Sequence, residues 1–401
     1  MAKRKIQKPT RFERMYKVWD YLRKNTDRRH PTSIAKMRKD ENINAYIGDK
    51  ETINRLLKDM ANIMNLEDGG SDYKPEAEWR LYFDDFKKFY GDKERYERDD
   101  SDEDDSYIAN VMRIKNLYYN RTFSEKEVDS IIEGIMATRT LDSKSAQELV
   151  RKVEDNMTTV FYKRTPRHIC KVQEPELADR ELLKDNLAII QKAIDDNVRI
   201  QFRFNGYSYE KKLEPVREES DELSPYYIVA SGGKYYLLAA KEYEGYKPNM
   251  SIWRIDLMTD IEIPGRNDRL HIKGIPRIPK KNVANLPEKW SEDFQLKHLN
   301  MSFDKPVLVT LRIKSEKCED NPKKRIRPGY TFLHDWFGDS FTYIRTETKP
   351  PYDDIVRVEC SPYGMAHWAL QYSELVEVLE PESLREDIIS KIKALNEKYS
   401  L

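Results

Sequence analysis

The stretch SPYYIVASGGKYYLLAAKEY, from Ser224 to Tyr243, decides the fold of the central part of the chain. Aromatic and β-branched runs flank Gly232 and Gly233, and glycine accepts the positive φ of a tight turn, so the stretch predicts a β-hairpin. Because side chains alternate across a strand, we expect one face of the second strand to be core and the other to be available for binding. The available face holds Lys234, Tyr236 and Leu238, and the core face holds Tyr235, Leu237 and Ala239.

Composition describes a protein of several domains with a thickly charged surface. The 401 residues allow two to four domains, and 35% are charged at a formal net charge of +0. No run approaches the roughly 20 apolar residues of a membrane span, and the N-terminus lacks the apolar core of a signal peptide. We therefore expect a cytoplasmic protein without a membrane partner. The three cysteines are Cys170, Cys318 and Cys360, and their spacing fits neither disulfides nor a zinc site. We therefore expect no metal or cofactor.

The first 60 residues are basic, with 17 Lys and Arg against 8 Asp and Glu. A basic segment of this kind predicts a polyanionic partner. For Met1 to Lys8 alone, a solvated basic tail is the alternative. The remainder is too regularly patterned for that interpretation.

Three helices are predicted in this basic segment. The first carries Phe12, Met15, Tyr16, Trp19 and Leu22, and Pro31 opens the second, which carries Ile34 and Met37. Asp49 is the expected N-cap of the third, whose buried stripe is Ile53, Leu56, Leu57, Met60, Ile63 and Met64. Its solvent face is expected to offer Lys50, Thr52, Asn54, Arg55 and Lys58. This arrangement is typical of a recognition helix in the DNA major groove, and a purely structural three-helix bundle is the alternative.

A mixed segment and an acidic run follow. Residues 79–90 fit either a wing or a helix, and the acidic run at 99–106 fits a solvated loop, with a DNA-mimicking inhibitory segment as the alternative. Residues 121–178 predict a helical connector. Ser124 and Glu127 form a capping box at its first helix, and Ser143 is expected to cap its second.

The second half of the chain predicts two mixed units. Residues 179–275 open with a helix and continue with four or more short strands, which indicate a small barrel or strongly curved sheet. A Pro-rich linker follows at 274–287, and residues 300–401 predict an α+β unit closed by a helix. The fold class is therefore an α+β multidomain protein.

Five motifs in this order resemble the bacterial WYL-domain transcriptional regulators. They are Thr52 to Arg55 in the third helix, residues 121–143 in the connector, Tyr235-Tyr236-Leu237 in place of Trp-Tyr-Leu, the strand Trp253 to Met258, and residues 367–399. The resemblance implies a winged helix-turn-helix at 1–120, an SH3-like β-barrel (WYL) sensing a nucleotide or single-stranded nucleic acid at 179–275, and a WCX-like dimerisation domain at 300–401. Two positions depart from the family: Tyr235 replaces tryptophan, and Leu257 stands where a second arginine is common.

The ligand site implied by this resemblance joins Lys234 and Tyr236 to Arg254 and Asp256 on the neighbouring strand. Arginine binds phosphate through a planar fork, tyrosine stacks on bases, and Asp256 orients the arginine. Arg203, Tyr207 and Arg217 are further candidates. The alternative is that Tyr236 and Arg254 form only a structural pair.

The sequence contains no recognisable catalytic motif. It has neither a GxxxxGK phosphate loop nor a GxSxG elbow, and its six histidines lack the spacing of metal ligands. We therefore expect no enzyme. The predicted function is a ligand-responsive transcriptional regulator that binds double-stranded DNA as a homodimer. An RNA- or single-strand-binding accessory or defence-system protein acting through the WYL domain is the alternative, and a nuclease is a distant third.

Overall fold

The computed structural model describes residues 9–67, 74–84, 114–138, 141–164, 180–318, 321–325 and 329–399. The chain divides into two units, Met1–Pro175 and Glu176–Leu401. The acidic run at 99–106 and Cys170 lie outside the described residues. Among the described residues, no helix has both the length and the apolar character that crossing a membrane requires.

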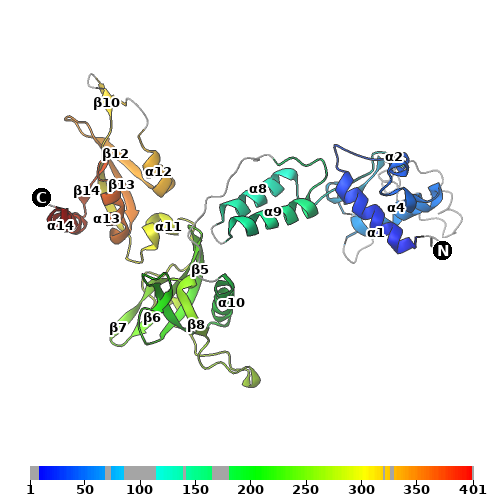
Figure 1. Cartoon of the computed structure of the whole chain (residues 1–401). Coiled ribbons are helices and arrows are strands. Elements are labelled where there is room, and N and C mark those ends of the chain that lie inside the picture. Colours follow the sequence, from blue (N-terminus) through cyan, green and yellow to red (C-terminus); the bar gives the residue numbers. More distant parts are fainter. Residues whose placement is uncertain are drawn as a thin grey trace. The chain divides into compact units, whose positions relative to one another are not determined.

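Four helices and a small sheet form the first part of the N-terminal unit (Figure 1). The helices are α1 (Arg11–Asn25), α2 (Ile34–Lys39), α3 (Asn44–Ile47) and α4 (Lys50–Asn65). They share one core, to which α1 gives Val18 and Leu22, α2 gives Met37, and α4 gives Ile53 and Leu57. The three expected helices are present, and α3 is an addition that the sequence pattern did not reveal.

Several details of these helices correct the expectations. Pro31 does not open α2; Ser33 is its N-cap and accepts a hydrogen bond from the backbone N–H of Lys36. Ile63, expected in the buried stripe of α4, is 68% exposed. Phe12 and Tyr16 of α1 are also exposed, at 71% and 51%.

The segment that fitted either a wing or a helix begins as a strand. After a short 3-10 turn (Glu76–Glu78), β1 (Leu81–Tyr82) pairs antiparallel with β2 (Tyr118–Tyr119). Asn65 at the end of α4 fixes this pair, since its Nδ2 donates to the Leu81 carbonyl at 2.8 Å. The core of the helices thereby extends onto the sheet, which adds Trp79, Leu81, Phe83, Ile114 and Leu117.

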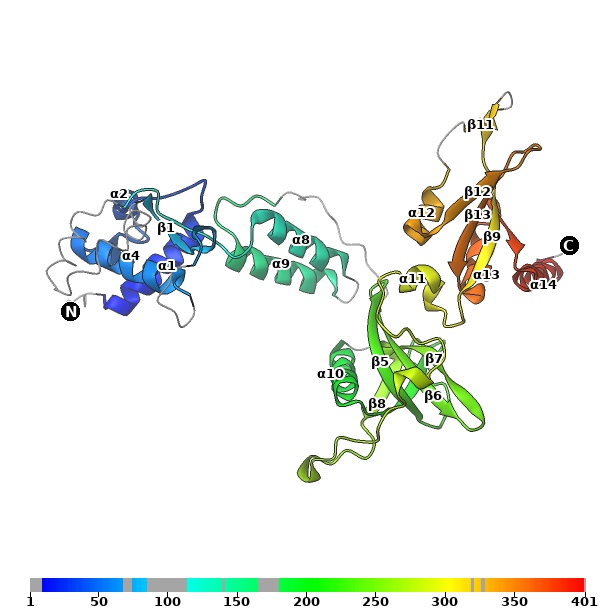
Figure 2. The same ribbon diagram turned by 180° about the vertical axis from the view of Figure 1, so that it is seen from behind.

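The expected connector helices form an antiparallel hairpin within the same unit (Figure 2). They are α8 (Glu125–Ala137) and α9 (Ser143–Met157). The capping box of Ser124 and Glu127 is confirmed, with both hydrogen bonds present. Asp142 caps α9 instead of Ser143, because its carboxylate accepts from the backbone N–H of Ser145 at 2.8 Å.

The second unit opens with α10 (Arg180–Asp196) and a curled six-stranded sheet. Gly232 and Gly233 have φ of 56° and 73°, so the hairpin is confirmed. The last two strands lie at opposite ends of the sheet although only the 3-10 turn Ile255–Leu257 separates them, so the sheet must curl to bring its ends together. The strands are β3 (Ile200–Tyr207), β4 (Leu213–Pro215), β5 (Asp221–Ser231), β6 (Lys234–Tyr243), β7 (Tyr246–Arg254) and β8 (Met258–Glu262).

A second layer covers the face of β6 that was expected to be available. Leu238 packs against Met250 of β7 and against Phe294 and Met301, which lie beyond the sheet in the sequence. Those two residues belong to α11 (Phe294–Lys297) and to the 3-10 turn Leu299–Met301. The Pro-rich segment is not a free linker either, because its Ile278 and Val283 pack with Tyr226 and Ala240 of the sheet.

The C-terminal module is a four-stranded sheet with helices, in the order β12-β13-β9-β14. This strand order and the βαββαβ succession are those of a ferredoxin-like fold. The expected strands and the last two helices are present, and α12 and the β10–β11 hairpin are additions. The elements are β9 (Val307–Ile313), β10 (Lys317–Cys318), β11 (Asn321–Arg325), α12 (Thr331–Phe337), β12 (Thr342–Thr346), β13 (Asp354–Cys360), α13 (Pro362–Gln371), β14 (Val376–Glu380) and α14 (Glu382–Tyr399).

Candidate nucleic-acid interface and ligand site

The start of α4 is fixed by its N-cap. One carboxylate oxygen of Asp49 accepts the backbone N–H of Thr52 at 2.7 Å, and the other accepts the Thr52 hydroxyl at 2.8 Å. The Thr52 N–H hydrogen bond, followed by the hydroxyl bond, lowers the pKa of Asp49 below its usual value. The expected cap is therefore confirmed, and it sets the direction in which the first turn of α4 presents its side chains.

Four of the five expected DNA-binding residues reach solvent. Lys50, Thr52 and Arg55 are exposed and Lys58 is half-buried. Arg55 also forms an exposed ion pair with Glu51 one turn earlier, at 3.0 Å. Such a pair is weak in water, so the guanidinium can exchange this partner for a phosphate or a base edge.

Asn54 does not reach solvent, which corrects the prediction that it lies on the recognition surface. Its side chain is 0% exposed. At 100° per residue, the buried positions of α4 cover about half of its circumference, because the helix packs into the core shared with α1, α2 and β1. A helix on the outside of a bundle would bury a narrower stripe.

A second group of cations, which was not among the expected DNA-binding residues, lies beside α4. Lys36, Arg38 and Lys39 of α2 are exposed, and the Arg38 Nη2 donates to the Gly48 carbonyl at 3.2 Å, immediately before α4. The run KMRKD carries the signal, but only the contact with Gly48 places it next to the start of α4. Exposed cations on both α2 and α4 suit a phosphate backbone.

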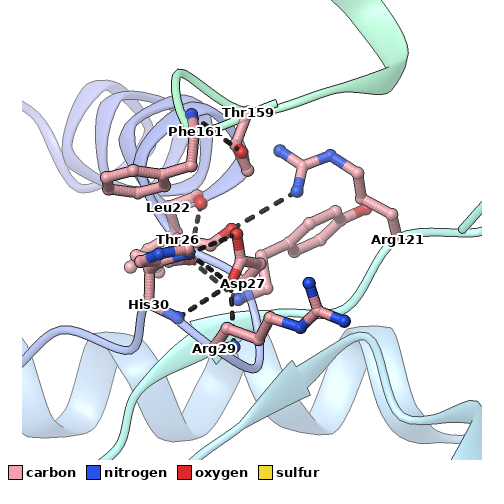
Figure 3. Close-up of polar contacts among 9 residues, drawn as sticks. Leu22, Thr26, Asp27, Arg29, His30, Arg121, Thr159 and Phe161 are labelled. Atoms are coloured by element: carbon pink, nitrogen blue, oxygen red, sulfur yellow. Dashed lines mark hydrogen bonds and ion pairs between the residues drawn. The ribbon is translucent and has the colours of Figure 1, made fainter. Parts of the chain in front are cut away.

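Arg121 joins the helical hairpin to the end of α1 (Figure 3). Its Nη1 donates to the Thr26 carbonyl at 3.3 Å and its Nη2 to the Thr158 carbonyl at 3.1 Å. Burial lowers the pKa of Arg121, with nearby carboxylates such as Asp27 opposing that shift. The guanidinium thus ties the residues after α9 to those after α1.

Aromatic and backbone contacts strengthen this junction. The ring of His30 stacks on Phe161 with centroids 4.1 Å apart, and its Nδ1 lies 3.0 Å from the Asp27 carboxylate (Figure 3). The Val160 N–H donates to the Lys24 carbonyl at 3.0 Å. The hairpin of α8 and α9 is therefore attached to the helical domain through the end of α1.

The curled sheet brings together three of the seven expected ligand residues. Tyr236 lies directly across from Arg254 in the β6–β7 pairing, and the Arg254 guanidinium binds Asp256 through two hydrogen bonds of 3.1 and 2.5 Å. Burial opposes the charge of Arg254, but the Asp256 carboxylate outweighs it and raises the pKa of the arginine. Tyr207 is exposed and close enough to add to that effect.

The remaining candidates are dispersed. Arg203 faces Asp260 at 3.7 Å with both side chains exposed, and Lys234 is half-buried at the hairpin turn. Arg217 is not part of the cluster. It binds the fully buried Asp221 and lies over the Trp253 ring, on the opposite face of β7 from Arg254.

Two buried asparagines position the turn that carries Asp256. The Asn186 Nδ2 donates to the carbonyls of Ile255 and Met258, at 3.2 and 2.8 Å. The Asn205 Nδ2 donates to the Leu257 carbonyl at 3.0 Å. No local sequence signal identifies these residues, because their partners are about 50 to 70 positions away.

An open groove of about 790 Å³ follows the edge strand β7. Tyr243 and Tyr246 stand at its rim, 58% and 78% exposed. The Lys241 ammonium lies 5.4 Å from the centre of the Tyr243 ring. Exposed rings beside a cation are what bases stack on in single-strand binding proteins.

Nothing in the described part of the chain brings three or more His, Cys, Asp or Glu side chains together in a way that could hold a metal ion. Burial raises the pKa of the Cys360 thiol to about 12, which keeps it protonated and unreactive.

The C-terminal module corresponds to a known domain family. Residues 305–395 match the WCX domain. The match runs from β9 to α14 and supports the resemblance to WYL and WCX regulators in this part of the chain.

Two solved structures are similar to the chain at low identity. Proteasome accessory factor B/C (PafBC) of Arthrobacter aurescens is 16% identical over 87% of this chain, with a TM-score of 0.24. The chain spans 55% of that structure's length. A structure described as a CRISPR Cas-related protein is 13% identical over 77% of each chain, with a TM-score of 0.28. No curated protein matches the chain.

Proposed function

We propose that the chain is a transcriptional regulator that binds duplex DNA through α4 and responds to a ligand at the curled sheet. The observation that carries the proposal is the solvent face of α4, where Lys50, Thr52 and Arg55 project from the first two turns. A short helix with donors at its start is the element that winged and other helix-turn-helix proteins insert into the major groove. The WCX match adds support from the other end of the chain.

The exposed cations of α2 would contact the phosphate backbone beside the groove. Phosphate contacts set register and affinity, whereas donors from α4 read base edges. Because a single short helix reads few base pairs, we propose that the regulator acts as a homodimer on paired half-sites. Such a protein would act in the cytoplasm, where bacterial DNA lies.

The ligand proposed for the curled sheet is a nucleotide or a short single strand. Tyr236 offers a ring for stacking, and Arg254 offers the part of its guanidinium that Asp256 leaves accessible, with 29% of the side chain exposed. Since the arginine is already paired, a phosphate must compete with the carboxylate. The helical hairpin would pass the response to α1 through the Arg121 junction. Coupling of this kind is typically worth about 1–3 kcal/mol.

DNA binding is tested by selecting bound sequences from random duplexes and then measuring anisotropy with the best site. Arg55→Ala should weaken binding by about 1–3 kcal/mol if Arg55 reads a base edge, and affinity should fall steeply with salt. Lys126→Ala, an exposed cation of α8, is the matched control and should bind like the wild type. Equal affinities for the Arg55 variant, the control and the wild type would refute the role of α4.

Ligand binding needs a variant that does not leave a buried charge. Arg254→Gln with Asp256→Asn removes both charges and keeps hydrogen-bonding groups, so the sheet should remain folded. Leu257→Arg is unsuitable, because Leu257 is buried and the arginine would be forced into the core. In titrations with nucleotides and short oligonucleotides, the double variant should lose binding while basal DNA affinity stays. Normal ligand binding by the double variant would place the sensor elsewhere.

A second function, single-strand or RNA binding by the sheet itself, is favoured by the groove beside β7. Tyr243 and Tyr246 are exposed there with Lys241 next to them. Tyr243→Ala with Tyr246→Ala should weaken single-strand binding and leave duplex binding by α4 intact. Both functions are binding functions, and we propose no catalytic activity. Cleavage of a duplex or single strand in Mg²⁺ would contradict this.

A further inference from the structure

The last helix of the WCX domain carries an apolar face that nothing in the described chain covers. α14 lies against α13 and β14 (Figure 1, dark red), with Leu384 buried and Ile388 packed against the core of the module. Four other apolar side chains point away from that core. They are Ile389, Ile392, Leu395 and Tyr399, with exposures between 39% and 72%.

The exposed side chains follow the spacing of a helix–helix seam. Ile389, Ile392, Asn396 and Tyr399 are separated by three, four and three residues, the repeat that keeps one line of side chains facing a partner helix. An 18-residue helix is about 27 Å long, so the seam runs through half of it. A mostly apolar line of this kind on a surface, interrupted here only by Asn396, indicates an interaction site.

The charges of α14 identify the partner. Its first half carries Glu382, Arg385, Glu386 and Asp387, and its second half carries Lys391, Lys393, Glu397 and Lys398, so the halves have opposite net charge. Two copies of α14 side by side in parallel would place like charges together. Two antiparallel copies place the acidic half of each against the basic half of the other.

Glu386 and Lys393 sharpen this complementarity. They lie seven residues apart on the same flank of the seam, both are exposed, and neither has an ion pair within the described residues. In an antiparallel pair centred between Ile389 and Ile392, Glu386 of one copy faces Lys393 of the other, and symmetry repeats the contact. Ile389 then packs on Ile392 of the second copy.

We propose that the chain dimerises through antiparallel pairing of α14 with α14 of a second copy, about a two-fold axis near the middle of the helix. The inference rests on the homodimer of the proposed function and names its surface. It concerns association in the absence of DNA, so it stands or falls independently of DNA binding by α4.

The seam is tested by sedimentation equilibrium of the full chain without DNA, at protein concentrations of about 1–100 μM, which extend well above a micromolar dissociation constant. The wild type should be a dimer at the upper end of this range. Ile392→Asp should raise the dissociation constant by about a hundredfold or more, because it places charges in the centre of the seam. Ala394→Asp, on the opposite side of the same helix, is the matched control and should leave the dimer unchanged.

Charge reversal tests the antiparallel direction. Glu386→Lys and Lys393→Glu should each weaken the dimer by about tenfold, since each creates two repulsive contacts in place of two attractive ones. The double variant should recover wild-type association, because the pairs are restored with reversed sign. Additive weakening in the double variant would exclude antiparallel pairing. A wild type that is still monomeric at about 100 μM, far above a micromolar dissociation constant, would overturn the proposal. A dimeric Ile392→Asp variant would do the same.

Discussion

The solvent face of α4 and the outward face of β6 differ in what covers them. Both were expected to be available, and both were assigned from the period of their side chains. On α4, Lys50, Thr52 and Arg55 are exposed. On β6, Leu238 is 0% exposed, because Phe294 and Met301 pack over it. Alternation gives a strand two faces, but it does not tell whether a later segment of the chain covers one of them.

The ion pairs of α4 and of the curled sheet also differ in their exposure to solvent. Arg55 and Glu51 are both about half exposed, whereas Asp256 has 2% of its side chain exposed when it binds Arg254. An exposed pair one helical turn apart is worth about 0.3–0.5 kcal/mol. Removing one partner of a buried pair costs far more, because the other charge stays desolvated. The exposed pair on α4 can therefore be broken at little cost, whereas the pair in the sheet also stabilises the fold.

Truncation of Leu238, on the covered face of β6, should have the largest effect on stability. Leu238→Ala should lower the free energy of unfolding of the sheet by about 2–5 kcal/mol, since it leaves a cavity between β6 and the second layer. Thr52→Ala on α4, the matched surface substitution, should change stability by less than about 0.5 kcal/mol, apart from the hydroxyl bond to Asp49. Hydrogen exchange during urea titration measures both effects, in residues 234–243 for Leu238→Ala and in residues 50–65 for Thr52→Ala. Equal effects of the two variants would mean that the second layer is not packed in solution.

Removal of a carboxylate should have the next largest effect. Asp256→Asn should destabilise the sheet by about 2 kcal/mol, less than for a fully buried pair because Arg254 keeps contact with water. Glu51→Gln on α4 removes the corresponding partner of Arg55 and should cost less than about 0.5 kcal/mol. Urea unfolding followed by circular dichroism compares the two variants. A loss with Glu51→Gln as large as with Asp256→Asn would remove the distinction between a surface pair and a buried pair.

The smallest effect concerns pH. Burial lowers the pKa of His298, a buried residue of the second layer stacked on Phe294, below its usual value near 6.5. Below pH 6.5 the unfolded chain therefore binds more protons than the folded chain. The stability that depends on neutral His298 is complete above pH 6.5 and is lost as the pH falls below it. Hydrogen bonds from Thr52 lower the pKa of Asp49 at the start of α4 below 3.8, so its contribution is lost only at pH values below 3.8.

The ordinary pKa is about 6.5 for His and about 3.9 for Asp. As the pH falls from about 7 to about 4, between these two values, the second layer should therefore lose stability while the cap of α4 keeps its contribution. Hydrogen exchange at several pH values, corrected for intrinsic rates, compares residues 294–302 with residues 50–65. His298→Gln should reduce the pH dependence of the stability of residues 294–302 and leave that of residues 50–65 unchanged. An unchanged slope in this variant would show that His298 does not titrate with unfolding.

Local chemistry could be read from the sequence where a few neighbouring residues suffice. The caps formed by Asp49 and by Ser124 with Glu127, the turn at Gly232–Gly233 and the strands of the C-terminal module all depend on residues close together in the chain. The pairing of Tyr236 with Arg254 also followed from the pattern, because two strands joined by a short turn must pair with their neighbours. DNA binding, the ligand and the dimer remain predictions.

The sequence by itself determined most of the helices and strands, the caps of α4 and α8, and which side chains of the strands share a face. Tertiary structure alone decided which of those faces meet water. Asn54 is buried because α4 packs on several elements at once, Arg217 is separated from Arg254 because it binds Asp221, and Arg121 attaches the helical hairpin to α1. Each of these outcomes depends on contacts between residues distant in sequence, and solvent exposure is a property of such contacts, whereas period, capping and turn geometry are properties of neighbours.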